Sequence, residues 1–165
     1  MTFGSSSAIF TQALLNPMLG RLWTTAAPTG FSSLSADTIN VALFNNTPTP
    51  NKDDTVGNTG YNTGQWLTSS EVTDATNWTA GGRALAGKAF AAGTGIVNFD
   101  ANDLSGAGNV TISNAFGDFV YDNTITAGTV AKQGLCYHAY GSAQGVTAGT
   151  FTLVWDATGV FKVTN

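Results

Sequence analysis

Cys136 and His138 are the residues whose types and spacing could support nucleophilic catalysis. They are the only cysteine and the only histidine of the chain, and two positions apart in a strand they would share one face. A thiol beside an imidazole can act as nucleophile and base. No glycine-rich nucleophile elbow accompanies the pair. We therefore expect a buried thiol and a hydrogen-bonded histidine rather than a catalytic dyad.

Acidic residues offer candidate calcium and glycosidase sites. Calcium takes several oxygen ligands from one tight loop, and the candidates are Asp53 with Asp54, and residues 100–103. Neither stretch matches an EF-hand loop. A glycosidase needs two carboxylates across a cleft, but Glu71 is the only glutamate and no aspartate stands out as its partner. One cysteine and one histidine cannot make a standard zinc site. We expect no catalytic residue, metal or cofactor.

Tryptophan side chains are well suited to contact a partner, because they are favoured at binding hot spots. The four tryptophans lie in four separate segments. Trp155 follows Phe151 and Leu153 at every second position and is expected in the core. Trp66 and Trp78 are either core and loop anchors, or contacts at an interface, or the rings of a carbohydrate-binding face. The sequence leaves these alternatives open.

Composition restricts the class of protein. The chain has 165 residues, of which 42% are hydrophobic and 10% charged, whereas about 25% is the usual charged fraction. This length suggests one domain, and the hydrophobic content is not that of a disordered chain. The net charge of −4 argues against nucleic-acid binding and against anionic membranes. No apolar run reaches the roughly 18 residues of a membrane span.

Short segments with strand character recur along the chain. At the C-terminal end Phe151, Leu153 and Trp155 alternate with Thr152, Val154 and Asp156. A turn follows at 156–159 and an apolar run restarts at Val160, which predicts a hairpin. A loop is expected at 45–64 and a linker at 141–149. The pattern predicts an all-β fold, an antiparallel β-sandwich or jelly-roll-like domain. The other expected strands are 37–44, 83–92, 95–100, 109–112, 115–122 and 135–140.

The N-terminal region is apolar and is expected to form an arm. A serine at positions 5–7 could cap a helix from about Ala8, and leucines and a methionine recur at helical spacing between Leu14 and Leu22. Pro17 interrupts this pattern. We therefore expect a short helical or extended arm over residues 1–30, followed by the β-sandwich domain over residues 31–165. The arm could fill the core of its own domain or dock on another subunit.

Several segments, taken together and in order, resemble a family of accessory virion proteins from tailed bacteriophages, most closely the capsid decoration, or cement, proteins. Each motif is short, but the order and spacing cover about residues 37–163. The motifs are DTINVAL at 37–43, EV at 71–72 with WTAGGRALAGK at 78–88, NFDAND at 98–103, VYDN at 120–123, and the stretch 151–163.

The resemblance implies a structural, non-enzymatic protein that binds the major capsid protein on the outer surface of the capsid and stabilises the lattice. It further implies a homo-oligomer, with a trimer favoured, made in the bacterial host cytoplasm and located on the virion. A tail, neck or fibre component and a carbohydrate-binding adhesin module are the alternatives. The residues expected at the capsid or subunit interface are Phe10, Leu14, Leu15, Met18, Leu22, Trp23 and Trp66.

Overall fold

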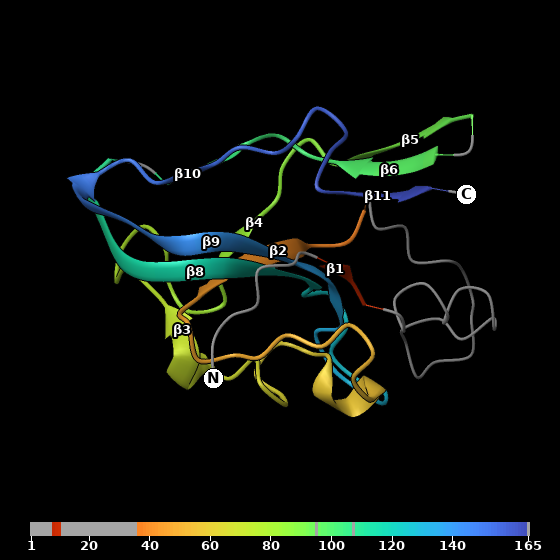
Figure 1. The fold of residues 1–165 in the computed structure, drawn as a ribbon, viewed down its shortest axis with the longest axis horizontal. Helices are drawn as coiled ribbons and strands as arrows, with labels where there is room; N and C mark the ends of the chain where they lie inside the picture. The colour runs from red at the N-terminus through yellow and green to blue at the C-terminus, as the bar shows by residue number, and fades with distance from the viewer. Residues whose placement is uncertain (1–7, 11–35, 95, 107, 165) are drawn as a thin grey trace.

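A six-stranded antiparallel sheet crosses the middle of the molecule (Figure 1). The computed structural model describes residues 8–10, 36–94, 96–106 and 108–164. The strands stand in the order β1-β9-β8-β2-β3, and β4 pairs with β2 as well. Their bounds are Ala8–Ile9 (β1), Ile39–Phe44 (β2), Glu71–Val72 (β3), Arg83–Ala84 (β4), Val110–Asp122 (β8) and Gly134–Gly149 (β9).

Shorter strands form a second layer, which lies above this sheet in Figure 1. A three-stranded antiparallel sheet has the order β11-β6-β5, and β10 pairs with β7. The fold is therefore all-β and sandwich-like, as the sequence predicts. The bounds are Ala89–Gly93 (β5), Ile96–Asp100 (β6), Leu104–Ser105 (β7), Thr152–Leu153 (β10) and Phe161–Thr164 (β11), and two 3₁₀ turns span Val56–Asn58 (η1) and Thr68–Ser70 (η2).

The two longest strands, β8 and β9, pair with each other over most of their length. The prediction of a linker at 141–149 is wrong, because these residues continue β9. The prediction of two strands at 109–112 and 115–122 is also wrong, because a single strand, β8, spans both segments. Register shifts interrupt the pairing at several points, and Asn114 and Gly141 have positive φ values of 59° and 75°. Bulges of this kind accommodate extra residues, so a stretch without alternation can still pair.

The C-terminal hairpin is predicted wrongly in its pairing, although its turn forms. Gly159 has a φ of 93° and its N–H donates to the carbonyl oxygen of Asp156 at 2.8 Å. The flanking strands do not pair with each other: β10 pairs with β7 and β11 pairs with β6. Between them, the backbone N–H of Trp155 donates to Asp103 and its indole N–H to the carbonyl oxygen of Asn102. The C-terminal stretch thus lies antiparallel to residues 96–105, and the turn is an insertion in that pairing.

The main hydrophobic core lies between the two layers. Ile39, Val41 and Leu43 of β2 lie in it, as their alternation predicts. Trp78 is fully buried there with its ring 5.5 Å from that of Phe151. The core has members from both layers, which include Phe99, Leu104, Val110, Ile112, Val120, Cys136, Leu153 and Val160.

A second core, the aromatic cluster, lies on the opposite face of the six-stranded sheet. Residues 45–70, which contain the predicted long loop, cover this face. Trp66 from this segment stacks on Phe119 of β8 with ring centroids 4.4 Å apart. The loop is therefore packed against the sheet along part of its length, while its tip at Lys52 and Asp53 is exposed as predicted. The aromatic cluster consists of Phe10, Phe44, Tyr61, Trp66, Phe119, Tyr121 and Tyr137.

The described part of the N-terminal region belongs to this core. Ala8 and Ile9 pair with β9 as a strand, so the prediction of a helix from about Ala8 is wrong. Phe10 and Trp66, expected at an interface, are 0% and 1% exposed, because both fill the aromatic cluster of their own chain. The remaining predicted contacts lie outside the described residues; they are Leu14, Leu15, Met18, Leu22 and Trp23.

Candidate functional site

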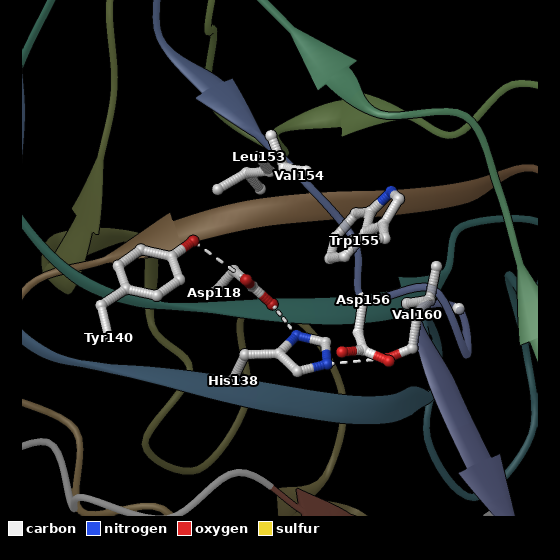
Figure 2. Close-up of a pocket in the computed structure, with 9 residues that line it drawn as sticks. Asp118, His138, Tyr140, Leu153, Val154, Trp155, Asp156 and Val160 are labelled. Atoms are coloured by element: carbon white, nitrogen blue, oxygen red, sulfur yellow. Dashed lines mark hydrogen bonds and ion pairs between the residues drawn. The ribbon is translucent and has the colours of Figure 1, made fainter.

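A hollow of about 290 Å³ lies between the six-stranded sheet and the segment that joins β10 to β11. Figure 2 shows Asp118, His138 and Tyr140 reaching into it from β8 and β9, with Trp155 on the opposite wall. The hollow brings together the chain's only histidine and a buried carboxylate. It is lined by Asp118, His138, Tyr140, residues 153–156, Gly159 and Val160.

Strand register brings the polar side chains together. Cys136, His138 and Tyr140 alternate along one face of β9, as predicted for that strand. Asp118 of β8 is the cross-strand partner of His138, and directly opposed side chains on neighbouring strands lie close enough to interact. The carboxylate therefore meets the imidazole through sheet pairing, across twenty residues of sequence.

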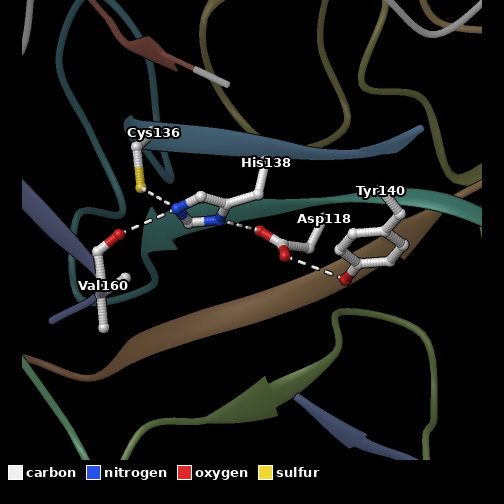
Figure 3. A network of polar contacts seen from close by, with 5 residues as sticks. All are labelled: Asp118, Cys136, His138, Tyr140 and Val160. Carbon is white, nitrogen blue, oxygen red and sulfur yellow. Dashed lines mark hydrogen bonds and ion pairs between the residues drawn. The ribbon is translucent and has the colours of Figure 1, made fainter. Parts of the chain in front are cut away.

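His138 donates a hydrogen bond from each ring nitrogen (Figure 3). Its Nδ1 lies 2.7 Å from Oδ1 of Asp118, and its Nε2 lies 2.8 Å from the carbonyl oxygen of Val160. Both partners are acceptors, since a carbonyl oxygen and an ionised carboxylate carry no proton. The ring therefore holds a proton on both nitrogens and is an imidazolium. The hydroxyl of Tyr140 donates to the other carboxylate oxygen, Oδ2, at 2.9 Å.

Electrostatics agree with this assignment. Burial alone would lower the pKa of His138, but the charge of Asp118 and the hydrogen bond to it outweigh burial and raise the pKa to about 12. Burial, followed by the charge of Asp118, raises the pKa of the Tyr140 hydroxyl well above its usual value. The Asp118 side chain is 1% exposed and that of His138 is 24% exposed. The network is thus a partly buried ion pair that joins β8 and β9 to the turn before β11.

The predicted Cys136–His138 pair is close in space but cannot act as a nucleophile and base in this arrangement. Sγ of Cys136 lies 4.0 Å from Nε2 of His138. That nitrogen already donates its proton to Val160, so it has no lone pair for the thiol proton. The thiol is buried, and burial raises its pKa. The expectation of a buried thiol and a hydrogen-bonded histidine is confirmed.

Asp118 is the member of the network that sequence reasoning did not single out. It stands in the strand segment AFGDFVYD, where most neighbours are apolar. A carboxylate inside such a segment is a signal, because a buried charge is retained only when it is paired or hydrogen-bonded. Its partner could not be named without the register of β8 on β9.

The acidic side chains of the predicted calcium stretches make hydrogen bonds or ion pairs within the fold. Asp54 accepts hydrogen bonds from Thr55 N–H and from the Asn58 amide, and Asp53 lies beside Lys52. In the other stretch, residues 100–103, the acidic side chains accept backbone N–H groups. Within the described ranges, no group of three or more histidine, cysteine, aspartate or glutamate side chains could hold a metal ion.

Glu71 anchors a turn. Its Oε2 accepts the Tyr61 hydroxyl at 2.6 Å and its Oε1 accepts the Gly81 N–H at 2.8 Å. Burial raises the pKa of this carboxyl. Asp74 accepts three backbone N–H groups at the start of its own turn and from β8. Both carboxylates therefore have structural partners and do not face each other across the hollow.

Trp66 and Trp78 are both core residues, with exposed fractions of 1% and 0%. Neither ring is therefore exposed in the way that a carbohydrate-binding face built on Trp66 or Trp78 requires. Trp155, expected in the core, is half-buried on the wall of the hollow, with its ring centroid 5.7 Å from that of His138.

Comparisons of the chain with protein-family models, with curated proteins and with solved structures find no match. Among the residues that the structure describes, no helix is long and apolar enough to cross a membrane.

Proposed function

We propose that this protein is a structural component of a tailed-phage virion that binds the outer surface of the capsid and stabilises its lattice. The proposal is supported by the ordered motifs between residues 37 and 163, by the sandwich-like fold, and most directly by the character of the molecular surface. It assigns the chain a role through contacts with other proteins.

The observation that carries the proposal is a surface with few charges. Exposed positions are occupied mainly by threonine, serine, asparagine, glycine and alanine. Charged residues are depleted at the cores of protein interfaces, because bringing a charge out of water without a partner is costly. A chain that is covered by neighbours needs few charges for solubility. In the described ranges the exposed charged residues are Lys52, Asp53, Asp100, Asp103, Asp156 and Lys162.

The internal construction suits such a role. The aromatic cluster and the Asp118–His138 ion pair tie both faces of the six-stranded sheet to their covering segments. A rigid subunit loses little conformational entropy when it joins a lattice, so more of its contact energy remains for binding.

Co-sedimentation tests the proposal. Tail-free capsid shells from the phage whose genome encodes the chain are mixed with the purified protein at low salt and at about 1 M salt, where the Debye length is about 3 Å. We expect binding at both salt concentrations, because contacts between uncharged surfaces are not screened. Failure to bind shells at either concentration would contradict the proposal.

The same experiment distinguishes a decoration protein from a tail, neck or fibre component. A tail component would sediment with tailed particles and remain in solution with tail-free shells. A decoration protein would bind both kinds of particle.

A further inference from the structure

Lys88 reaches from the second layer to the six-stranded sheet. It stands directly before β5, its side chain is half-buried, and its Nζ lies 2.5 Å from the backbone carbonyl oxygen of Asp37. Asp37 belongs to the chain that leads into β2, which Figure 1 shows turning toward the second layer. The amine of Lys88 is thus held beside an acidic residue of the opposite layer.

A second buried acid, Asp122, lies beside Asp37. Asp122 ends β8 opposite Ile39 of β2, whose side chain lies in the main core, so the Asp122 carboxyl points to the same side of the sheet. The Asp37 carboxyl is within hydrogen-bonding reach of the Asp122 carboxyl. The exposed fractions of Asp37 and Asp122 are 8% and 0%. Two acids thus lie together on the side of the sheet from which Lys88 approaches.

These two acids are not fully satisfied when both are ionised. Oδ1 of Asp122 accepts the Thr124 N–H at 2.8 Å, but Oδ2 of each acid is buried and has no hydrogen-bond donor in the described part of the chain. A hydrogen bond between the two carboxyl groups requires that one of them hold a proton. Burial is the main cause, followed by the charge of Asp37, that raises the pKa of Asp122 to about 6. Asp122 can therefore take up and release a proton near neutral pH.

A lysine amine held among buried acids can form an amide, because removal from water favours the neutral forms that react. We propose that Nζ of Lys88 joins Cγ of Asp37 in an isopeptide bond, for which Asp122 relays the protons. Nζ already contacts the main chain of Asp37. Rotation of the flexible lysine side chain brings the amine to the carboxyl group of the same residue.

The reaction balances without a cofactor or an oxidant. The ammonium of Lys88 and the carboxylate of Asp37 give one amide and one water molecule. Asp122 accepts a proton from the ammonium, which frees the nitrogen lone pair to attack Cγ of Asp37, and passes that proton to a carboxylate oxygen of Asp37. After a second proton has moved from the nitrogen along the same route, this oxygen leaves as water and Asp122 is unchanged.

The bond connects the chain before β2 to the chain before β5 and so joins the two layers of the sandwich. It encloses residues 37–88 in a covalent loop. A crosslink that closes a long loop stabilises the fold chiefly by restricting the unfolded chain, as a disulfide does. The inference does not depend on the virion role.

Intact-mass spectrometry of the purified full-length protein tests the proposal, because amide formation releases one water molecule. We expect the wild type, denatured before measurement, to weigh one water molecule less than its sequence. Lys88→Ala and Asp37→Ala should each have the full mass of their sequence. Lys52→Ala is the matched control, since it removes a lysine at the exposed tip of the loop and should keep the loss of water. The wild-type measurement does not depend on the folding of any variant.

Tryptic digestion locates the bond, because trypsin does not cleave after an acylated lysine. We expect residues 22–52 joined to residues 84–132, and Asp122→Asn should contain far less of this product. A wild type with the full mass of its sequence would overturn the proposal. So would a loss of water that persists in Lys88→Ala, which indicates a succinimide at an aspartate, or a bond that maps to Asp122 within residues 84–132. Complete bond formation in Asp122→Asn would overturn the proton-relay role of Asp122.

Discussion

At the scale of single residues, His138 determines how the candidate site behaves. Its two nitrogens donate to Asp118 and to the carbonyl oxygen of Val160. An imidazolium in this position links three segments and neutralises a carboxylate that is almost fully buried. Removal of His138 would leave the buried charge of Asp118 without a partner. The resulting loss of folding free energy is larger than the net stabilisation that the ion pair itself provides.

The first prediction concerns the pH dependence of stability. The pKa of His138 is about 12 in the folded protein and about 6.5 in an unfolded chain. Above pH 6.5 the unfolded state therefore releases a proton that the folded state keeps. Stabilisation by this group is complete below pH 6.5 and is lost progressively as pH rises toward 12. Urea unfolding between pH 7 and 8.5 should show a loss of about 1 kcal/mol per pH unit.

His138→Gln supplies the control for this slope. Glutamine does not titrate, so the variant should be less stable at pH 7 but should show a much flatter dependence on pH. Because the comparison is between slopes, a general loss of stability does not affect it. An unchanged slope in the variant would mean that His138 is not the titrating group.

The second prediction concerns Cys136. The thiol is buried and its pKa is raised by burial, whereas only the thiolate reacts readily. We expect iodoacetamide at pH 7.5 to label the native protein at the rate of global unfolding and to label it rapidly in urea. Mass spectrometry of timed samples gives both rates. Rapid labelling of the native protein would show an accessible, activated thiol and would restore the catalytic interpretation.

At the scale of elements, the turn at Gly81 and Gly82 is held on the six-stranded sheet by hydrogen bonds to β2 and β8. Both residues have positive φ values, 89° and 68°. The carbonyl oxygen of Gly81 accepts hydrogen bonds from the Tyr121 hydroxyl at 2.7 Å and from the Asn40 amide at 3.0 Å. The two glycines differ in the room that surrounds them for a side chain. A Cβ on Gly82 would lie 1.9 Å from the carbonyl oxygen of Val41, whereas a Cβ on Gly81 would have no neighbouring atom closer than 3.5 Å.

The third prediction uses this difference. Gly81→Ala should cost about 1 kcal/mol, the usual strain of alanine at positive φ. Gly82→Ala adds a clash with backbone and should cost at least about 2 kcal/mol more. Chemical denaturation of both variants measures the difference. Equal losses would contradict the close packing of this turn on β2.

The fourth prediction tests the position of Phe10. Because the ring is fully buried among Trp66, Phe119 and Tyr137, Phe10→Ala should destabilise the isolated protein by about 3–5 kcal/mol. Leu67→Ala is the control, since Leu67 is 43% exposed and should change stability by no more than about 0.5 kcal/mol. If Phe10→Ala lowers the free energy of unfolding by less than about 1 kcal/mol, Phe10 is not buried in the aromatic cluster and belongs to an exposed arm, as the sequence suggests.

Elements with clear alternation could be predicted from the sequence, and those fixed by pairing could not. The alternation of Ile39, Val41 and Leu43 with their neighbours predicts the buried face of β2, and all three lie in the main core. The second half of β9 has no such alternation and is held by a bulged pairing with β8. In the candidate site, the shared face of Cys136 and His138 follows from strand geometry, but Asp118 and the carbonyl of Val160 join it only through tertiary contacts.

At the scale of the whole molecule, the protein combines a well-ordered interior with a surface that carries few charges. Six of its charged side chains are exposed in the described ranges, and others lie within the buried or half-buried networks of Asp118, Glu71 and Asp122. Charge is thus used in part to fix the fold. Such a surface suits lateral contact with neighbouring proteins more than free diffusion at high concentration.

The most direct test of the proposed role is the copy number of the protein on the virion. Quantitative mass spectrometry of purified particles gives the ratio of this chain to the major capsid protein, and cryo-electron microscopy of the same particles locates it. The proposal predicts a fixed ratio that corresponds to one site per lattice repeat, with density on the outer face of the shell. A few copies per particle located at the tail or neck, or absence from the particle, would contradict it.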